Sequence, residues 1–411
     1  MTTTSAPDLR TSIHDGTRGC RDDLLTASHA IHALAEIGFE EFESSRLLSE
    51  LIEQRGFVVE RGVSGMPTAF VARRGNTGPH VAFLCEYDAL RGLGHACGHN
   101  LIATSSAGAG IALAESLGAA GVDARVTIVG TPAEEGGGGK IPLCHDGLFD
   151  DCDAVLIFHP SDRTASVQYA LACTHWEWTF RGKAAHAAGH PDQGINALDA
   201  FVQAYNGISL WRQQLRDDAR VHGFVIEGGT APNIIPELTR GEYLTRARDG
   251  EYLRTMNTRF RAIFEAAAQA TGCTLQLDER ETYLDLRSNP VLAELASVHL
   301  AGVGLAEDRV TPWERTGSTD VGDVSYAAPT LHPEFAIADD GIGPHTHAFR
   351  EAALSPRGEE AMLKAAEVLA RIGADVILDS EVRQRVRDAF LTQPQHRDAW
   401  KGSGATAVYN D

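Results

Sequence analysis

The segment His80-Val-Ala-Phe-Leu-Cys-Glu-Tyr-Asp88 leads into the loop Gly94-His-Ala-Cys-Gly-His-Asn100. A short apolar run bounded by glycine and polar residues is typical of a buried strand in a parallel sheet. In open α/β sheets, ligands bind just beyond the carboxyl ends of such strands. The segment therefore predicts an α/β fold with a polar site directly after residue 85.

Three later apolar segments end in the same way. Residues 125–130 precede the pair Glu134-Glu135, residues 154–158 end on His159, and residues 331–338 precede a loop with His345 and His347. We expect thiol, imidazole and carboxylate groups from the four segments to meet at one edge of one sheet. This combination of groups indicates a metal centre, with metal-assisted hydrolysis as its chemistry.

Cys97 and His99 form the strongest pair of candidate ligands. In an extended loop, side chains two residues apart project to the same side. A thiolate can bridge two divalent ions, and its softness suits zinc, cobalt or manganese. The alternatives are a buried structural thiol beside a surface histidine and a Cys-His nucleophile dyad. The dyad is disfavoured because neighbouring loop residues rarely reach the geometry of attack.

Glu134 and Glu135 suit a division of labour, because successive side chains diverge. One carboxylate can bind metal while the other acts as general base towards the attacking water. The alternative is a solvated acidic turn. The glycine run at 136–139 is not a phosphate loop, because Ile141 follows Lys140 where Ser or Thr is required. We expect it to allow close approach of the backbone.

Composition and charge exclude several classes of protein. The chain has 411 residues, with 36 basic and 56 acidic side chains and a formal charge of −20. Such a surface repels nucleic acid and anionic membranes. No signal peptide and no run long enough to span a bilayer is expected. Seven cysteines without tight spacing do not suggest a disulfide framework, which favours a cytoplasmic location.

The pattern of elements changes near residue 174. Strand patterns at 174–180, 221–227, 240–247 and 274–280 alternate with helical patterns at 193–215 and 250–271. The order β-α-β-β-α-β is that of a ferredoxin-like domain. We predict that residues 174–287 are inserted into a discontinuous α/β domain formed by residues 1–173 and 288–390, with a C-terminal tail at 391–411. Helical periodicity at 20–55 predicts helices that break near Gly38, and a helix of small residues is expected at 101–118.

These motifs resemble the M20 metallopeptidase family over nearly the whole chain. The resemblance rests on Glu86-Tyr-Asp-Ala-Leu90 and His95-Ala-Cys-Gly-His99, and it is closest to the amidohydrolase branch, with aminobenzoyl-glutamate hydrolases, auxin-conjugate hydrolases and related dipeptidases. It implies that Cys97 bridges two metal ions and that His99, Glu135, His159 and His345 bind them. His345 is preferred to His347 because Phe349 follows it by four residues. The resemblance also implies that Glu134 is the catalytic base and that Asp88 orients a ligand.

The resemblance has further implications for the predicted insertion. His186 would donate to the oxyanion in the site of a neighbouring subunit, and Asn233 with Arg246 would hold a substrate carboxylate. The insertion would act as a lid and form a homodimer. The expected cofactors are two divalent ions, zinc or manganese with cobalt as an alternative. Three departures from the family pattern are Asn100, His347 and Ala35, and the first two are expected to bear on substrate choice.

The function expected from the sequence is hydrolysis of the amide bond of a small N-acyl or aminoacyl amino acid, or of a dipeptide, with a free carboxylate. The alternatives are deacetylation of an N-acetyl diamino acid and hydrolysis of an auxin-like conjugate. A non-catalytic module that binds a metal or ligand is a third possibility. An intact Glu134 speaks against this module, because a pure binder needs no proton shuttle.

Overall fold

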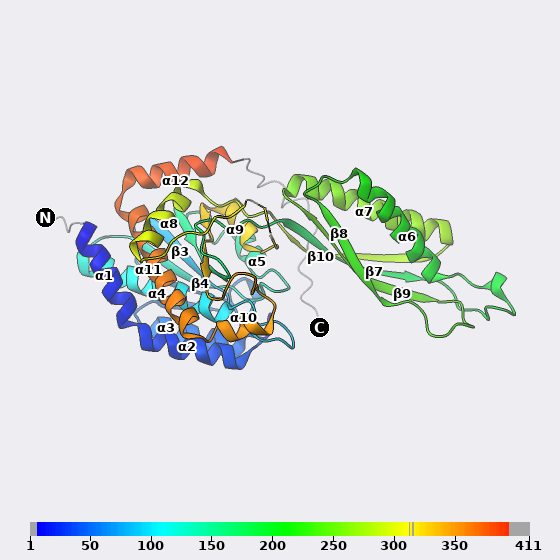
Figure 1. Cartoon of the computed structure of the whole chain (residues 1–411), viewed down its shortest axis with the longest axis horizontal. Coiled ribbons are helices and arrows are strands. Elements are labelled where there is room, and N and C mark those ends of the chain that lie inside the picture. The colour runs from blue at the N-terminus through cyan, green and yellow to red at the C-terminus, as the bar shows by residue number, and fades with distance from the viewer. Residues whose placement is uncertain (1–5, 312, 315, 394–411) are drawn as a thin grey trace. The chain divides into compact units, whose positions relative to one another are not determined.

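The computed structural model describes residues 6–311, 313–314 and 316–393. The chain forms two compact units (Figure 1). The second unit comprises Ala170–Asp285 with Thr316–Thr319, and the first contains the rest of the described chain. The second unit thus overlaps the predicted insertion at 174–287. Most of the predicted tail at 391–411 lies outside the described residues.

The first unit is built on a six-stranded sheet of order β1-β2-β4-β3-β5-β11. Its strands are β1 (Val58–Arg61), β2 (Phe70–Arg74), β3 (His80–Cys85), β4 (Arg125–Gly130), β5 (Ala154–Leu156) and β11 (Thr330–Leu331). Strands β4, β3, β5 and β11 are parallel, as predicted, whereas β1 and β2 pair antiparallel. The connection from β1 to β2 is too short for the crossover that parallel strands require.

Helices cover this sheet (Figure 1). They are α1 (Ala6–Gly19), α2 (Arg21–Leu34), α3 (Phe42–Gln54), α4 (His99–Ala120), α5 (Lys140–His145), α8 (Pro290–Gly302), α9 (Val321–Ala327), α10 (His347–Ala352), α11 (Pro356–Leu378) and α12 (Ser380–Thr392). The small residues of α4 allow close packing, because a Cβ on Gly110 would lie 2.5 Å from Ile128. By length and composition α4 could cross a membrane, contrary to the expectation that no run was long enough. Its apolar window is 89% buried inside the protein, as in a core helix.

Two predicted segments differ from the observed strands. The apolar stretch at 331–338 is divided into β11 and β12 (Glu334–Ala336). His159 does not lie beyond a strand end but opens β6 (His159–Ser161), which pairs with β12 in a separate two-stranded ladder. The backbone N–H of His159 donates to Pro333 O at the start of this ladder.

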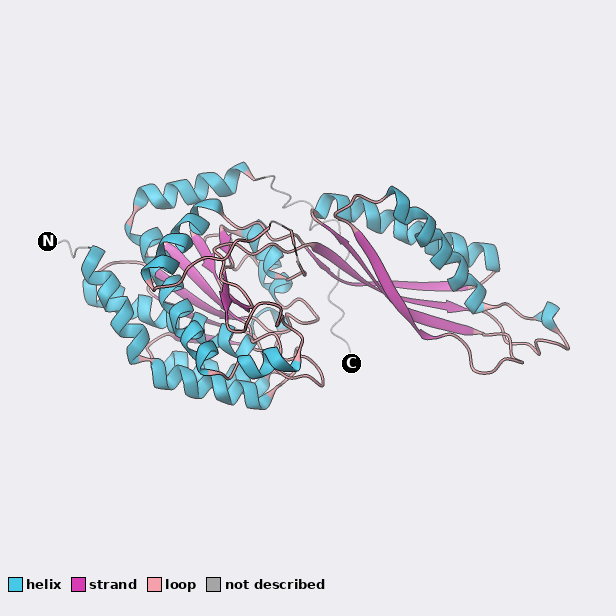
Figure 2. Ribbon diagram, viewed as in Figure 1, coloured by secondary structure: helices cyan, strands magenta, loops and turns pink. Residues whose placement is uncertain are grey.

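The second unit is a four-stranded antiparallel sheet of order β10-β7-β9-β8, with two helices on one face (Figure 2). In chain order the elements are β7 (Ala172–Arg181), α6 (Ala197–Trp211), β8 (Arg220–Glu227), β9 (Leu238–Ala247), α7 (Gly250–Thr271) and β10 (Thr274–Tyr283). Each predicted strand and helix of this region is present, with bounds that differ by a few residues. The order β-α-β-β-α-β follows.

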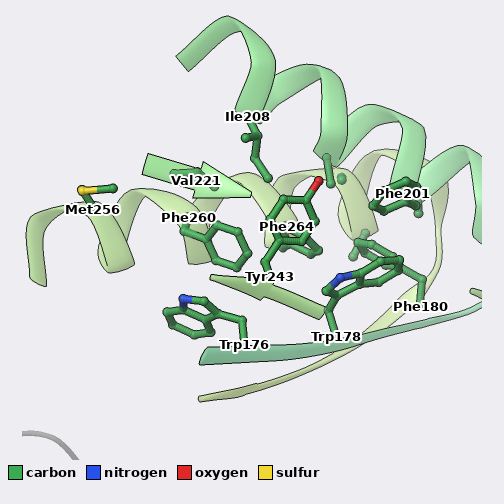
Figure 3. Packing of buried hydrophobic residues seen from close by; sticks show 14 of the residues in the cluster. Trp176, Trp178, Phe180, Phe201, Ile208, Val221, Tyr243, Met256, Phe260 and Phe264 are labelled. Atoms are coloured by element: carbon green, nitrogen blue, oxygen red, sulfur yellow. The ribbon is translucent and has the colours of Figure 1, made fainter. Parts of the chain in front are cut away.

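Aromatic side chains fill the space between this sheet and its helices (Figure 3). Trp178 stacks on Phe201 with ring centroids 4.6 Å apart, and Phe180 stacks on Phe264 at 5.6 Å. The opposite side of β7 is polar, and His175 there contacts a glutamate of a neighbouring strand. The period-two alternation of β7 therefore reflects one buried face and one wetter face.

Candidate metal centre

The loop between β3 and α4 brings Cys97 next to His159. Its turn depends on Gly98, which has a φ of 79° and lies so close to Pro160 that a Cβ would be 2.8 Å away. Cys97 Sγ lies 3.4 Å from His159 Nε2. His159 Nδ1 is 2.6 Å from Pro160 O, where it can only donate, so Nε2 is left with a lone pair that faces the thiol.

His99 is held by a buried carboxylate. Its Nδ1 lies 3.0 Å from Asp88 Oδ1, and Asp88 Oδ2 accepts a hydrogen bond from Glu135 N at 2.9 Å. Asp88 thus connects the Cys/His loop to the glutamate loop. A carboxylate on the far nitrogen of a histidine is the usual support for a metal-ligating imidazole. His99 Nε2 then points to carboxylate oxygens of Glu86 and Glu134, each 3.7 Å away.

The two adjacent glutamates face different neighbours, as their divergent directions predict. They follow Ala133, which adopts a left-handed φ of 57°. Glu134 lies beside His99, while Glu135 Oε2 lies 3.3 Å from His345 Nε2. His345 itself has a φ of 64° and donates its backbone N–H to Ala96 O.

The predicted ligand residues gather into overlapping groups whose donor atoms lie within 4.8 Å of one another. These groups are Cys97 with His99 and His159, Cys97 with Glu135 and His345, and His99 with Glu134 and Glu135. Cys97 and His99 each belong to two groups. The geometry therefore suits two neighbouring cations that share the thiol.

The donor set fits cations in its charge as well as its shape. Five largely buried carboxylates surround one lysine, namely Glu86, Asp88, Glu134, Glu135 and Asp320 around Lys140. Burial, with the charges of Glu86 and Glu135, raises the pKa of Glu134 well above its usual range. His99 Nε2 and Glu135 Oε1 lack hydrogen-bond partners among the described residues. Buried acceptors without partners are costly, and cations at this position would satisfy them.

Lys140 and Asp320 belong to this centre but were not predicted as site residues. Lys140 Nζ lies 2.7 Å from both Glu86 Oε1 and Asp320 Oδ1, and its backbone N–H donates to Asp320 Oδ2. Burial lowers the pKa of Lys140, but the charges of Asp320 and Glu86 outweigh it and raise the pKa overall. A lysine that directly follows a glycine run and begins a helix was the one available signal.

The remaining predicted residues lie in the second unit, at two different ends of its sheet. His186 forms an isolated bridge with Ile234, and Ala187 N donates to Asn233 O, so His186 and Asn233 are neighbours. Arg246 lies near the far end of β9, where its Nη1 donates to Ser318 Oγ at 2.7 Å. Eight residues of extended strand separate Arg246 from Leu238, which is about 27 Å. Asn233 and Arg246 of one chain therefore do not hold the same small carboxylate.

The three departures from the family pattern have structural explanations. Ala35 ends α2 with a φ of 47°, which a proline ring cannot adopt. Asn100 is fully buried and donates to Ser28 Oγ at 2.9 Å. This contact gives Asn100 a packing role and does not support the expectation that it selects substrate. His347 opens α10 and is exposed.

Comparison with known proteins adds a family to this geometry. The chain matches peptidase family M20/M25/M40 over residues 83–375. It is 38% identical to a Xaa-Arg dipeptidase of Mus musculus over 384 residues, which cover 90% of this chain and 89% of the relative. It is 31% identical to a p-aminobenzoyl-glutamate hydrolase of Escherichia coli, with 88% and 91% covered.

The fold also occurs among solved structures. A dinuclear metal-binding peptidase of the M20 family from Bacillus subtilis superposes with a TM-score of 0.66. The match covers 88% of this chain and 99% of that protein, at 19% sequence identity. At this identity the likeness concerns the fold.

Proposed function

Because the chain belongs to peptidase family M20/M25/M40 and is a metal-dependent amidohydrolase, we propose that it cleaves dipeptides or N-acyl amino acids that carry a free carboxylate. The observation that carries this proposal is the pair Glu134-Glu135 beside His99, with one carboxylate directed to each side of a two-cation donor set. Relatives named as a dipeptidase and as an aminobenzoyl-glutamate hydrolase act on such amides.

In this proposal the donors hold two divalent ions, zinc or manganese with cobalt as an alternative. Cys97 would bridge them, and the other ligands would be His99, Glu135, His159 and His345. When bound, such ions polarise a carbonyl and lower the pKa of water. The mixed thiolate, imidazole and carboxylate set is compatible with each of these metals. The similar Bacillus subtilis peptidase binds two metals, which supports the count.

The side chains of the chain then have distinct tasks. Glu134 takes a proton from the attacking water and delivers it to the leaving nitrogen. Asp88 keeps His99 in one orientation and anchors the backbone of Glu135. His186 donates to the oxyanion, and Arg246 and Asn233 bind the substrate carboxylate.

Because Asn233 and Arg246 lie at opposite ends of one sheet, we infer that two copies of the chain contribute to each site. The second unit would then be a ferredoxin-like lid that dimerises. Its edge strand β8 supports this, since Phe224, Val225 and Ile226 are 58%, 38% and 48% exposed. An unpaired apolar edge strand is a ready surface for pairing with another chain. All seven cysteines are free, which supports a cytoplasmic location.

The dimer can be tested at β8. Ile226→Lys places a charge on the unpaired edge and is expected to convert the dimer to monomer in sedimentation velocity. Activity should fall with dimer content because each site would lose its partner's His186. Val58→Lys is the matched control, since Val58 is 78% exposed on the edge strand β1 of the first unit. A monomeric wild-type protein with full activity would refute the shared site.

The substrate class is tested with metal-loaded protein and a panel of dipeptides, including Xaa-Arg, N-acyl amino acids and aminobenzoyl-glutamate, each paired with its C-terminal amide. We expect cleavage of the free acids and poor cleavage of the amides. Arg246→Ala should lower kcat/KM for the acids by roughly 10–10²-fold, the contribution of a charged hydrogen bond. It should leave the amides unchanged.

Arg240→Ala serves as the control, because Arg240 is exposed on the same strand and pairs with Glu227. Equal losses for acids and amides in Arg246→Ala would remove Arg246 from carboxylate binding. Preference for N-acetyl diamino acids or auxin-like conjugates in the panel would instead favour the two alternative hydrolases.

A further inference from the structure

The connection between α2 and α3, residues 35–41, contains two non-glycine residues with left-handed backbone. Ala35 has a φ of 47° and Phe39 a φ of 63°. Each such residue costs on the order of 1–3 kcal/mol and persists only where the surroundings determine it. The connection is therefore held in a costly shape, and its contacts indicate why.

The connection packs against the loop that carries Glu134. A Cβ on Gly38 would lie 3.0 Å from Ala133 Cβ, and a Cβ on Gly137 would lie 2.3 Å from the Phe39 ring. Between these contacts, Glu41 Oε1 accepts a hydrogen bond from Ala133 N at 2.8 Å. Ala133 is the left-handed residue immediately before Glu134.

Glu41 is fully buried and stands at the N-cap position of α3, yet its side chain makes no capping hydrogen bond. Glu36 caps the helix instead, because its carboxylate accepts from Ser44 N at 2.8 Å and Glu43 N at 3.0 Å. Burial and the Asp88 charge raise the pKa of Glu41 to about 7. A buried ionisable group is expensive, and the helix it begins does not need it.

We propose that Glu41 is a positioning residue, which fixes the left-handed turn at Ala133 and thereby aims Glu134 at the attacking water. The inference rests on the proposed role of Glu134 as general base. One peptide unit separates the anchored amide from Glu134, so a released turn would move that carboxylate directly. A misplacement of about 1 Å can cost 10²-fold in rate.

Two substitutions separate positioning from charge. Glu41→Gln keeps an acceptor oxygen at the same reach but removes the charge, whereas Glu41→Asp keeps the charge and withdraws the oxygen by one methylene. We expect Glu41→Asp to lower kcat by roughly 10–10²-fold with KM and the content of two metals per chain unchanged. Glu41→Gln should keep kcat near wild type. Glu36→Asp is the matched control and should affect stability alone, by about 1 kcal/mol.

A readout without turnover is hydrogen exchange of the metal-loaded protein, followed in peptides that cover residues 131–139. Exchange at Ala133 should accelerate in Glu41→Asp and stay slow in Glu41→Gln. In the Glu134→Gln background, Glu41→Asp should cause little further loss of kcat, because residues that act as a unit are not additive.

The proposal is overturned if Glu41→Asp keeps wild-type kcat and exchange, if Glu41→Gln is impaired as much as Glu41→Asp, or if the losses of Glu41→Asp and Glu134→Gln simply multiply. Wild-type turnover of Glu134→Gln is a different result. It would remove the proposed base, while the exchange data would still report whether Glu41 holds the loop.

Discussion

Glu134→Gln should lower kcat by roughly 10²–10⁴-fold, the usual contribution of a general base, while KM and metal content stay near wild type. Glutamine keeps the size and hydrogen-bonding reach of the side chain but cannot take a proton from water. The loss corresponds to about 2.7–5.4 kcal/mol of transition-state stabilisation. Single-turnover kinetics on the metal-loaded variant would assign this loss to the chemical step.

The neighbouring residue provides the contrast. Glu135 lies 3.3 Å from His345 Nε2 and belongs to the donor groups around Cys97. Glu135→Gln should therefore weaken metal binding, and excess metal should recover part of its activity. Metal should not rescue Glu134→Gln. Loss of metal from Glu134→Gln, together with retained metal in Glu135→Gln, would exchange the two roles.

The metal ligands could be predicted from the sequence because each follows a short apolar run. Such a run indicates a buried strand, and the carboxyl ends of parallel strands share one edge of a sheet. His159 shows the limit of this reasoning. It was expected beyond a strand end but opens β6, because its backbone pairs with β12.

The rest of the centre depends on tertiary packing. Lys140 follows a glycine run, a context typical of an exposed lysine, and no local pattern shows that two carboxylates bury it. Asp320 is 180 positions away in the chain and follows no apolar strand. Likewise, Asn233 and Arg246 are only 13 positions apart, but the register of β9 takes them to opposite ends of a sheet.

Lys140→Met should destabilise the protein by about 3–5 kcal/mol, the cost of removing one partner from a buried ion pair. Methionine fills a similar volume but leaves Glu86 and Asp320 without their cation. Both carboxylates are almost fully buried, so water cannot replace the ammonium group. Denaturant unfolding at matched metal loading would measure the change, with the half-buried Lys364→Met as control.

The sign of the pH dependence follows from the same charges. Without Lys140, the carboxyl groups should have higher pKa values in the folded state than in the unfolded chain. The folded variant then binds protons that the unfolded chain has released, so its stability falls as pH rises above the unfolded pKa. The penalty of Lys140→Met should therefore be larger at pH 8 than at pH 5.

Asp320→Asn in the Lys140→Met background should recover part of the stability, because it removes one of the unpaired charges. Equal midpoints for Lys140→Met and Lys364→Met, or a penalty independent of pH, would contradict this account. If the three-residue network is as tightly coupled as its two 2.7 Å contacts indicate, Asp320→Asn alone should be destabilising, although it stabilises the variant that lacks Lys140. This reversal of sign distinguishes an electrostatic network from simple packing around Lys140, which would make the two losses add.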